Sequence, residues 1–223
     1  MEDRRIRDMI EVGQALYTRG LLVACDGNVS VRTEENNVLI TASGFCKGKL
    51  TEKDFSLVSM RGELLQGPKP ARDIRMHLAA YRLLPDVRAI AHAHPPVTSG
   101  FSMTGWDASE IALPEAMFTL RDIACTRYAS PTTIEVPREV ARALEEKPNA
   151  RAILLAAHGA LTMGDDIWDA FYKMETLELF FKATLVAKLL GGPQPLTGEQ
   201  MTIVRRMIAG EKPDDVVPAE GGF

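Results

Sequence analysis

The chain has 223 residues, of which 46% are hydrophobic and 25% charged, and its formal net charge at pH 7 is −4. This composition is typical of a folded globular protein and excludes a disordered chain, which has fewer hydrophobic residues and more net charge. The acidic balance is unlike that of a nucleic-acid-binding domain, and no apolar run approaches the roughly 20 residues that cross a bilayer. A charged N-terminus without an apolar stretch predicts no secretory signal. The cysteines are odd in number and lack a CxxC spacing, which indicates reduced thiols in a cytoplasmic protein.

The first part of the chain is predicted to alternate between helices and hairpins. Apolar residues recur with a helical period over residues 6–20. Apolar residues on both sides of the polar segment 34–37 predict one hairpin, and residues 55–65 predict a second. Prolines bracket a further helix, which is expected at 73–84.

The second part of the chain predicts alternating strands and helices. The expected elements are a strand at 87–91 that the next prolines break, a helix from Pro114, a short strand at 123–125, a helix with Pro137 at its first position, a buried strand at 152–157, a long helix capped at 165–166, and a last helix at 198–209. No repeat or linker interrupts this series. We therefore expect one α/β domain over residues 1–210, with helices on both faces of its sheet, and a mobile tail at 211–223.

Three of the four histidines stand at predicted strand ends. His92 and His94 follow the strand at 87–91, and His158 ends the strand at 152–157. Side chains two residues apart in an extended chain point the same way, so His92 and His94 can converge on one ion. If the two strands are neighbours, His158 can join them. Three nitrogen ligands with an open fourth position describe a catalytic zinc site, although unrelated structural histidines would also fit the pattern.

Two further candidates belong to the predicted helix at 73–84. Asp73 stands at its start, where a carboxylate can serve as a proton-transfer group or simply favour the helix N-terminus. His77 lies inside the helix and is expected to be structural, with a supporting role near the metal as the alternative.

Small residues form two turns, one entering and one leaving the first predicted hairpin. Because the strands of a hairpin pair, these turns are expected to lie side by side. The backbone amides of Gly27 and Gly44 and the side chains of Asn28 and Ser43 can then form an anion-binding concavity. Ordinary turn chemistry explains the same residues.

Taken together, these motifs resemble the class II aldolase/adducin family, and most closely its L-fuculose-1-phosphate aldolase branch. The resemblance runs from about Val12 to Leu190. The segments that carry it are Gly27-Asn28-Val29-Ser30, Thr41-Ala42-Ser43-Gly44, Ile74-Arg75-Met76-His77, Ala91-His92-Ala93-His94 and His158-Gly159-Ala160. Their combination is far more specific than any one motif.

The resemblance implies a three-layer αβα domain with a central, mostly antiparallel or mixed sheet. It implies a zinc ion, or another divalent metal such as manganese or cobalt, and an acid/base role for Asp73. The implied metal ligands are His92, His94 and His158. The residues implied to surround a substrate phosphate are Gly27, Asn28, Ser43 and Gly44. Homotetramers with active sites at subunit interfaces are implied in the same way.

The chain departs from the aldolase pattern at several positions. Asp73 stands where the aldolases usually have glutamate, and the related L-ribulose-5-phosphate 4-epimerases have aspartate. Ala71 and Arg72 replace two phosphate-binding serines, although the guanidinium of Arg72 can hold a phosphate or carboxylate and makes it a candidate substrate-binding residue. No tyrosine follows Tyr172 to act as a C-terminal acid, and Met117 stands near the place of an epimerase aspartate.

We therefore expect a zinc-dependent aldolase that cleaves a ketose phosphate, such as L-fuculose 1-phosphate, through an enediolate stabilised by the metal. A sugar-phosphate epimerase, a dehydratase or a decarboxylase would use the same three histidines, and neither fold nor metal separates these reactions. A non-catalytic interaction module of the adducin type is the alternative outside the enzymes. The expected partners are a small anionic substrate and further copies of the chain, without nucleic acid or membrane.

Overall fold

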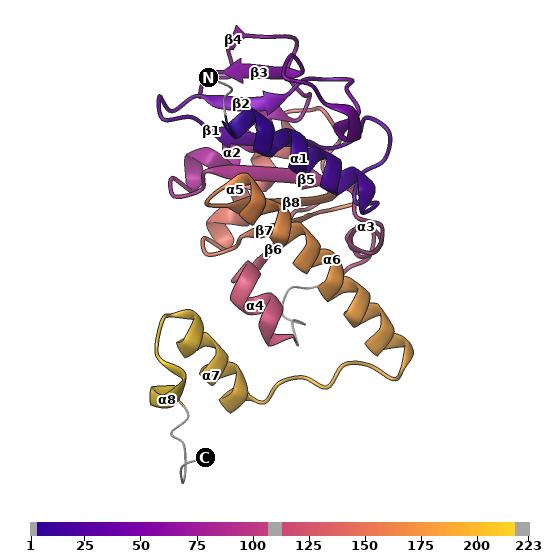
Figure 1. The fold of residues 1–223 in the computed structure, drawn as a ribbon. Helices are drawn as coiled ribbons and strands as arrows, with labels where there is room; N and C mark the ends of the chain where they lie inside the picture. Colours follow the sequence, from indigo (N-terminus) through magenta and orange to yellow (C-terminus); the bar gives the residue numbers. More distant parts are fainter. Residues whose placement is uncertain (1–3, 107–112, 217–223) are drawn as a thin grey trace.

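The computed structural model describes residues 4–106 and 113–216. The central element of these residues is a sheet of eight strands in the order β4-β3-β2-β1-β5-β8-β7-β6, which runs from β4 at the top of Figure 1 downwards to β6. Neighbouring strands are antiparallel except β6 and β7, which are parallel. The predicted mixed, mostly antiparallel sheet is therefore confirmed.

The bounds of the elements follow the chain order in Figure 1. The strands are β1 (Asn28–Arg32), β2 (Val38–Thr41), β3 (Phe55–Val58), β4 (Leu64–Gln66), β5 (Ala89–Ala93), β6 (Ile123–Cys125), β7 (Ala152–Leu155) and β8 (Gly159–Gly164). The helices are α1 (Arg4–Thr18), the 3-10 helix η1 (Lys47–Lys49), α2 (Ile74–Leu83), α3 (Pro96–Ser102), α4 (Pro114–Leu120), α5 (Glu135–Glu146), α6 (Ile167–Leu189), α7 (Gly198–Ile208) and α8 (Pro213–Val216).

Helices cover both faces of the sheet. On one face α1, α3, α4 and α6 surround a core that includes Leu16, Phe171 and Phe181. On the other face α2 and α5 pack through residues such as Tyr81 and Leu144. Burial of large apolar side chains on both faces is the main source of stability for such a domain. The predicted three-layer αβα arrangement is confirmed.

Strands β1 and β5 turn polar side chains toward α2. Successive residues of a strand point to opposite faces, so Val29 and Val31 enter the core on the α1 and α6 side. Asn28 and Ser30 point the other way and form hydrogen bonds with side chains of α2. In the antiparallel register Asn28 lies opposite His92 of β5. This register brings together the predicted motifs that contain Asn28, His77 and His92.

Several elements differ from the sequence predictions. The strand expected at 152–157 ends at Leu155, and the chain returns as β8, which was not predicted. All six residues of β8 are buried, so its sequence lacks the alternation that marks a half-exposed strand. Pro96, expected only to break a strand, is the first residue of α3, and α5 begins at Glu135, ahead of Pro137. Proline has no N–H to offer, and the first turn of a helix leaves its N–H groups unpaired in any case.

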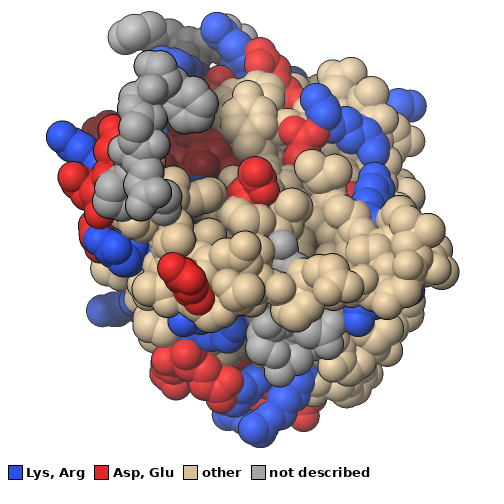
Figure 2. All heavy atoms as spheres, turned by 90° about the horizontal axis from the view of Figure 1, so that it is seen from below, with Lys and Arg blue, Asp and Glu red and all other residues tan. Residues whose placement is uncertain are grey.

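The C-terminal part of α6 extends beyond the sheet, and α7 and α8 lie past it in Figure 1. Figure 2 views the molecule from this end and shows uncharged residues over a broad area of the face. The exposed large apolar side chains near the C-terminus of α6 are Leu179, Leu185, Val186, Leu189 and Leu190. Within the described residues, no helix combines the length and the apolar composition needed to traverse a bilayer. Of the predicted tail, residues 213–216 form α8, and 217–223 lie outside the described residues.

Candidate metal centre and active site

The structure brings three histidines together at the C-terminal end of β5. The ligand atoms of His92, His94 and His158 all lie within 4.8 Å of one another. The Nε2 atoms of His92 and His94 are 3.2 Å apart, and the ring of His158 lies 4.8 and 5.1 Å from those of His92 and His94. These are the three histidines that the sequence predicted to converge.

The route by which they converge differs from the prediction. His92 lies within β5 rather than after it, and β5 does not neighbour β7, because β8 lies between them. His158 occupies the turn that leads into β8, where Ala160 pairs with Ala93. A side chain at Gly159 would place its Cβ 2.6 Å from the carbonyl oxygen of Ala93. Glycine at this position therefore allows the turn to approach β5 closely.

The three imidazoles are held in their neutral form. Burial keeps the pKa of His92 well below its ordinary value of 6.5 and lowers the pKa of His94 and His158. Nδ1 of His92 lies 2.9 Å from the carbonyl oxygen of Ala160. A carbonyl only accepts, so Nδ1 carries the proton and Nε2 presents its lone pair to the cluster. Neutral nitrogen donors that face one another at this spacing fit a divalent cation.

Asp73 lies beside this cluster. Its Oδ2 is 3.8 Å from Nε2 of His92 and accepts a hydrogen bond of 2.9 Å from Nδ2 of Asn28. Asp73 precedes α2, but its side chain forms no capping hydrogen bond with the helix, so helix capping does not explain the residue. Burial raises the pKa of the Asp73 carboxyl, but the nearby ring of His92 and the hydrogen bond from Asn28 act in the opposite direction and leave the pKa below its ordinary value. The carboxylate is therefore ionised and faces the site.

A chain of hydrogen bonds orients Asp73 from behind. Because an ionised carboxylate only accepts, Asn28 turns its NH₂ group to Asp73 and its Oδ1 to Nε2 of His77, 2.6 Å away. His77 then carries its proton on Nε2, and its Nδ1 accepts from the hydroxyl of Ser30 at 2.7 Å. The hydroxyl of Tyr81 lies 2.9 Å from that of Ser30 and donates to the Ser30 backbone carbonyl at 3.1 Å, which holds Ser30 in place. From Ser30 to Asn28 each donor thus points toward Asp73, which gives His77 a supporting role.

A cavity of about 350 Å³ opens in front of these groups. Its lining contains the predicted site residues Gly27, Asn28, Ser43, Gly44, Arg72, Asp73, His94 and His158. His92 is fully buried behind them. Gly27 has a φ of +63°, and a Cβ there would lie 2.5 Å from the carbonyl oxygen of His92, so the turn needs glycine. Arg72 is exposed at this cavity and also lines a neighbouring one of about 700 Å³.

Sequence reasoning missed two charged residues of the cavity. Oδ2 of Asp26 lies 3.8 Å from Nδ1 of His94. Lys47 is buried and lines the cavity from η1. Its nearness in the chain to Ser43 and Gly44 was the available signal, but a lysine followed by glycine in a turn predicts an exposed side chain.

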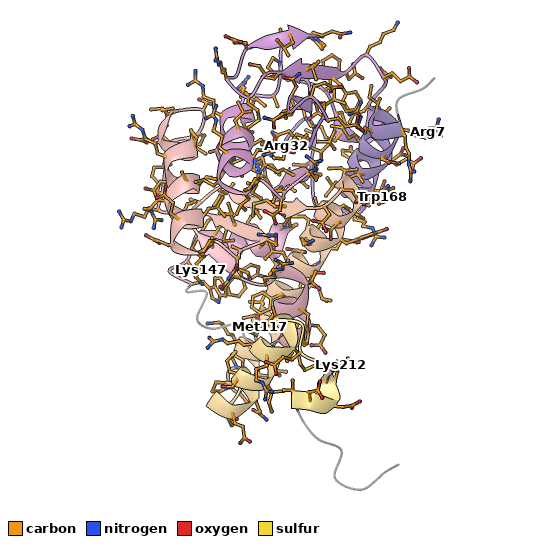
Figure 3. The ribbon with its side chains drawn as sticks, turned by 90° about the vertical axis from the view of Figure 1, so that its left-hand side faces the viewer. Arg7, Arg32, Met117, Lys147, Trp168 and Lys212 are labelled. Atoms are coloured by element: carbon orange, nitrogen blue, oxygen red, sulfur yellow. The ribbon has the colours of Figure 1, made fainter. Side chains whose placement is uncertain are left out.

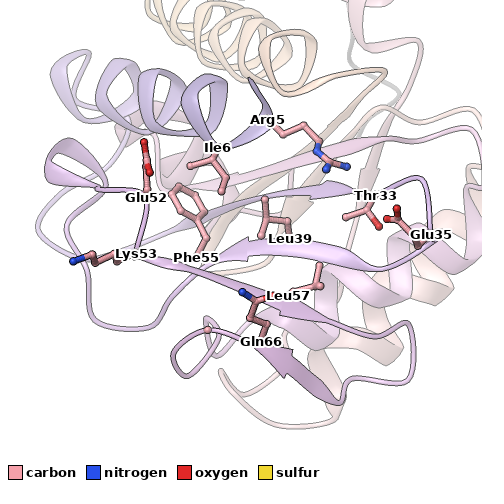
Figure 4. A pocket seen from close by; sticks show the side chains of 11 residues that line it. Arg5, Ile6, Thr33, Glu35, Leu39, Glu52, Lys53, Phe55, Leu57 and Gln66 are labelled. Atoms are coloured by element: carbon pink, nitrogen blue, oxygen red, sulfur yellow. The ribbon is translucent and has the colours of Figure 1, made fainter. Parts of the chain in front are cut away.

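Two other regions lie outside this site. A cavity of about 400 Å³ beside α1, on the opposite face of the sheet, has an apolar floor with charged side chains around it (Figure 4). It contains none of the predicted site residues. Met117, which stands near the place of an epimerase aspartate, is buried in the core on α4, toward the α7 end of the molecule in Figure 3.

Comparisons with known proteins agree with the site. Residues 7–185 match the model of the Class II Aldolase and Adducin N-terminal domain family. The chain is 34% identical over 182 residues to a 3-oxo-tetronate 4-phosphate decarboxylase of Haemophilus influenzae, covering 78% of this chain and 85% of that protein. It is 33% identical over 171 residues to an L-fuculose phosphate aldolase of Methanococcus maripaludis, covering 77% and 91%.

The fold is also similar to a solved structure. The L-fuculose-1-phosphate aldolase from Thermus thermophilus superposes with a TM-score of 0.73 at 32% identity, covering 86% of this chain and 100% of that one. The family match spans every residue that lines the candidate site. The chain belongs to the class II aldolase and adducin family.

Proposed function

We propose that the protein is a metal-dependent lyase that breaks a carbon–carbon bond of a phosphorylated ketose such as L-fuculose 1-phosphate. The observation that carries this proposal is that three neutral imidazoles and one carboxylate meet at the wall of one cavity. The similarity to enzymes, an aldolase and a decarboxylase among them, supports it. A non-catalytic module has no use for converging, unprotonated imidazoles.

His92, His94 and His158 are the proposed ligands of a zinc ion. The nitrogen set and its open side fit zinc, and manganese or cobalt would accept the same donors. A divalent cation held there supplies positive charge that polarises a substrate carbonyl and stabilises the negative charge left when the carbon–carbon bond breaks. The buried Ala160 carbonyl keeps the His92 ring in the orientation that this requires.

Asp73 is the proposed acid/base. Its ionised carboxylate lies at the cavity wall within 3.8 Å of His92. It would first take the proton of the substrate hydroxyl group as the carbon–carbon bond breaks, and then deliver this proton to the carbon that has lost its bond; the reverse direction runs the same two transfers backwards. The chain from Tyr81 to Asn28 fixes the carboxylate, so little reorganisation is needed when the proton moves.

The proposed anion subsite lies at the loops that enter β1 and leave β2. Gly27, Asn28, Ser43 and Gly44 line this part of the cavity, and Arg72 adds a guanidinium at its exposed side. Asn28 gives one amide N–H to Asp73 and keeps a second N–H for a ligand. We place the phosphate of the substrate here.

Decarboxylation of a phosphorylated 3-oxo acid is the second candidate function. The similarity to the Haemophilus influenzae decarboxylase favours it. Both reactions leave a negatively charged carbon beside a carbonyl, so the same residues serve either. An epimerase or dehydratase has no such support among the relatives named above.

The active form is proposed to be a homotetramer in the cytoplasm. The exposed apolar side chains near the C-terminus of α6 support association with further copies, since monomers rarely expose such a group of residues. Small-angle scattering would measure the assembly.

The test of the proposed function is a pair of substrate assays on zinc-loaded protein. L-fuculose 1-phosphate is expected to give two carbonyl products, detected directly by NMR. Release of CO₂ from 3-oxo-tetronate 4-phosphate, without aldol cleavage, would replace the first candidate by the second. The matched control is the Asp73→Asn variant, in which either reaction should be lost. Turnover of neither substrate at full metal occupancy would overturn both candidates.

A further inference from the structure

Lys47 is a buried cation to which the proposed function assigns no role. Only 2% of the residue is exposed, yet it lines the same cavity as Asp73 and His158. Lysine is almost never fully buried unless its charge is matched. In the part of the chain that the structure describes, the bonds of its Nζ go to two backbone carbonyls and to no carboxylate.

The two carbonyls place the ammonium group between the loops of the anion subsite. Nζ donates to the carbonyl oxygens of Cys25 and Phe45, each at 2.8 Å. Cys25 leads into the loop that contains Gly27, and Phe45 directly follows Gly44. An ammonium group has three N–H donors, so one remains for a ligand in the cavity.

The backbone that carries Lys47 is fixed against α1. A Cβ at Gly13 of α1 would lie 2.8 Å from the carbonyl oxygen of Lys47, and a Cβ at Gly48 would lie 2.5 Å from the ring of Tyr17. These close approaches leave η1 little room to shift. The backbone from which the Lys47 side chain extends is therefore held in place, and the two hydrogen bonds to carbonyl oxygens hold its end.

Burial lowers the pKa of Lys47 below its ordinary value, and the nearby groups of Cys25, Cys46, Asp26 and Asp73 offset only part of this effect. Both carbonyl acceptors also favour the protonated group. A bound anion would act in the same sense and would match a charge that is expensive to keep away from water.

We propose that Lys47 is a specificity-determining residue, whose third N–H binds a phosphate oxygen of the substrate between the loops at 25–27 and 43–45. The inference rests on the proposed function only in requiring a phosphorylated ligand. The side chain of Arg72 is exposed and can change its conformation. The ammonium group of Lys47, in contrast, is already held by two hydrogen bonds and need not be ordered when the ligand binds. The cavity thus selects for a ligand with a full negative charge at this end.

The test measures binding of inorganic phosphate to the whole protein by isothermal titration calorimetry. Lys47→Met keeps the apolar stem and removes the charge, and Lys49→Met is the matched control, since Lys49 is exposed on the same 3-10 helix. We expect the phosphate Kd to rise roughly tenfold or more in Lys47→Met, as for the loss of a hydrogen bond to a charged group. In Lys49→Met it should change by less than about twofold, because exposed charges are screened.

A purely structural role would give a different result. If Lys47 only ties the loops together, Lys47→Met would melt at a lower temperature but bind phosphate as the native protein does, which would overturn the proposal. If the variant does not fold, a crystal structure of the native protein with inorganic phosphate decides. A phosphate oxygen within hydrogen-bond distance of Lys47 Nζ supports the proposal, and phosphate bound elsewhere rejects it. Neither measurement needs turnover, so a failure of the proposed reaction would be seen separately.

Discussion

Asn28 holds Asp73 through a hydrogen bond of 2.9 Å from Nδ2 to Oδ2, while its Oδ1 lies 2.6 Å from Nε2 of His77. One amide therefore transmits the orientation of a buried histidine to the carboxylate at the cavity. The sequence motif around Asn28 predicted contact with a substrate anion. In the structure the same residue also positions the proposed acid/base, because the β1–β5 register sets it opposite His92.

Removal of one histidine of the cluster should remove the metal. We expect the native protein to bind about one zinc ion per chain, and His92→Ala or His158→Ala to lose both metal and turnover while remaining folded. Elemental analysis by mass spectrometry measures the metal, and circular dichroism checks the fold. Full metal occupancy in both variants would show that these imidazoles are not the ligands.

Asp73→Asn should separate binding from chemistry. The amide keeps the size of the side chain but cannot exchange a proton, so kcat is expected to fall by roughly 10²- to 10⁴-fold while the metal stays bound. Asp73→Glu restores the aldolase pattern and is expected to raise aldol cleavage. Steady-state kinetics with the substrate that the two assays select would measure both effects. An unchanged kcat in Asp73→Asn would exclude the acid/base role.

His77 should make the stability of the fold depend on pH. Burial lowers the pKa of His77 from 6.5 to about 4, so between these values the unfolded chain binds the proton and the folded chain does not. The contribution is fully present above pH 6.5 and is lost as the pH falls toward 4, by at most about 3 kcal/mol in the free energy of unfolding. Urea denaturation of the native protein and of His77→Gln across this range measures the difference. Parallel pH dependences would contradict a buried neutral His77.

Arg72→Ser should weaken substrate binding more than catalysis. If the guanidinium holds the anion equally in the ground and transition states, KM rises by about tenfold or more and kcat changes little. Arg75→Ser is the control, because Arg75 lies nearby in the first turn of α2, is exposed and does not line the cavity of the site. An unaltered KM in Arg72→Ser would mean that its side chain faces solvent.

Most of the fold could be predicted because hydrophobic periodicity and turn residues reflect local structure. The helix over α1, both hairpins and the Asp166 cap of α6, whose side chain accepts from the backbone N–H of Asp169, all follow local rules. β8 could not be predicted, because glycine at both of its ends and Thr162 inside it leave neither the alternation of a half-buried strand nor the continuous apolar run that marked β7. The pairing of β5 with β8 depends on contacts between segments distant in the chain.

The candidate site divides in the same way. His92 and His94 could be paired by their spacing, whereas His158 joins them through a turn that only the fold defines. Lys47 was missed because its burial depends on the packing of η1 against α1, and nothing in its neighbours predicts this. The direction of the hydrogen bonds from Ser30 to Asp73 also requires atomic positions.

The alternation of side chains along β1 determines where the chain can accept an inserted residue. Asn28 and Ser30 face α2, and Val29 and Val31 face the opposite core. Inserting a single residue after Asn28 would reverse the faces of the residues that follow, burying the Ser30 hydroxyl in the apolar core and pointing Val29 and Val31 toward α2. Changes of length should therefore be tolerated in the turn at 33–37 but not within the strand, and an insertion scan scored by soluble expression would map that boundary.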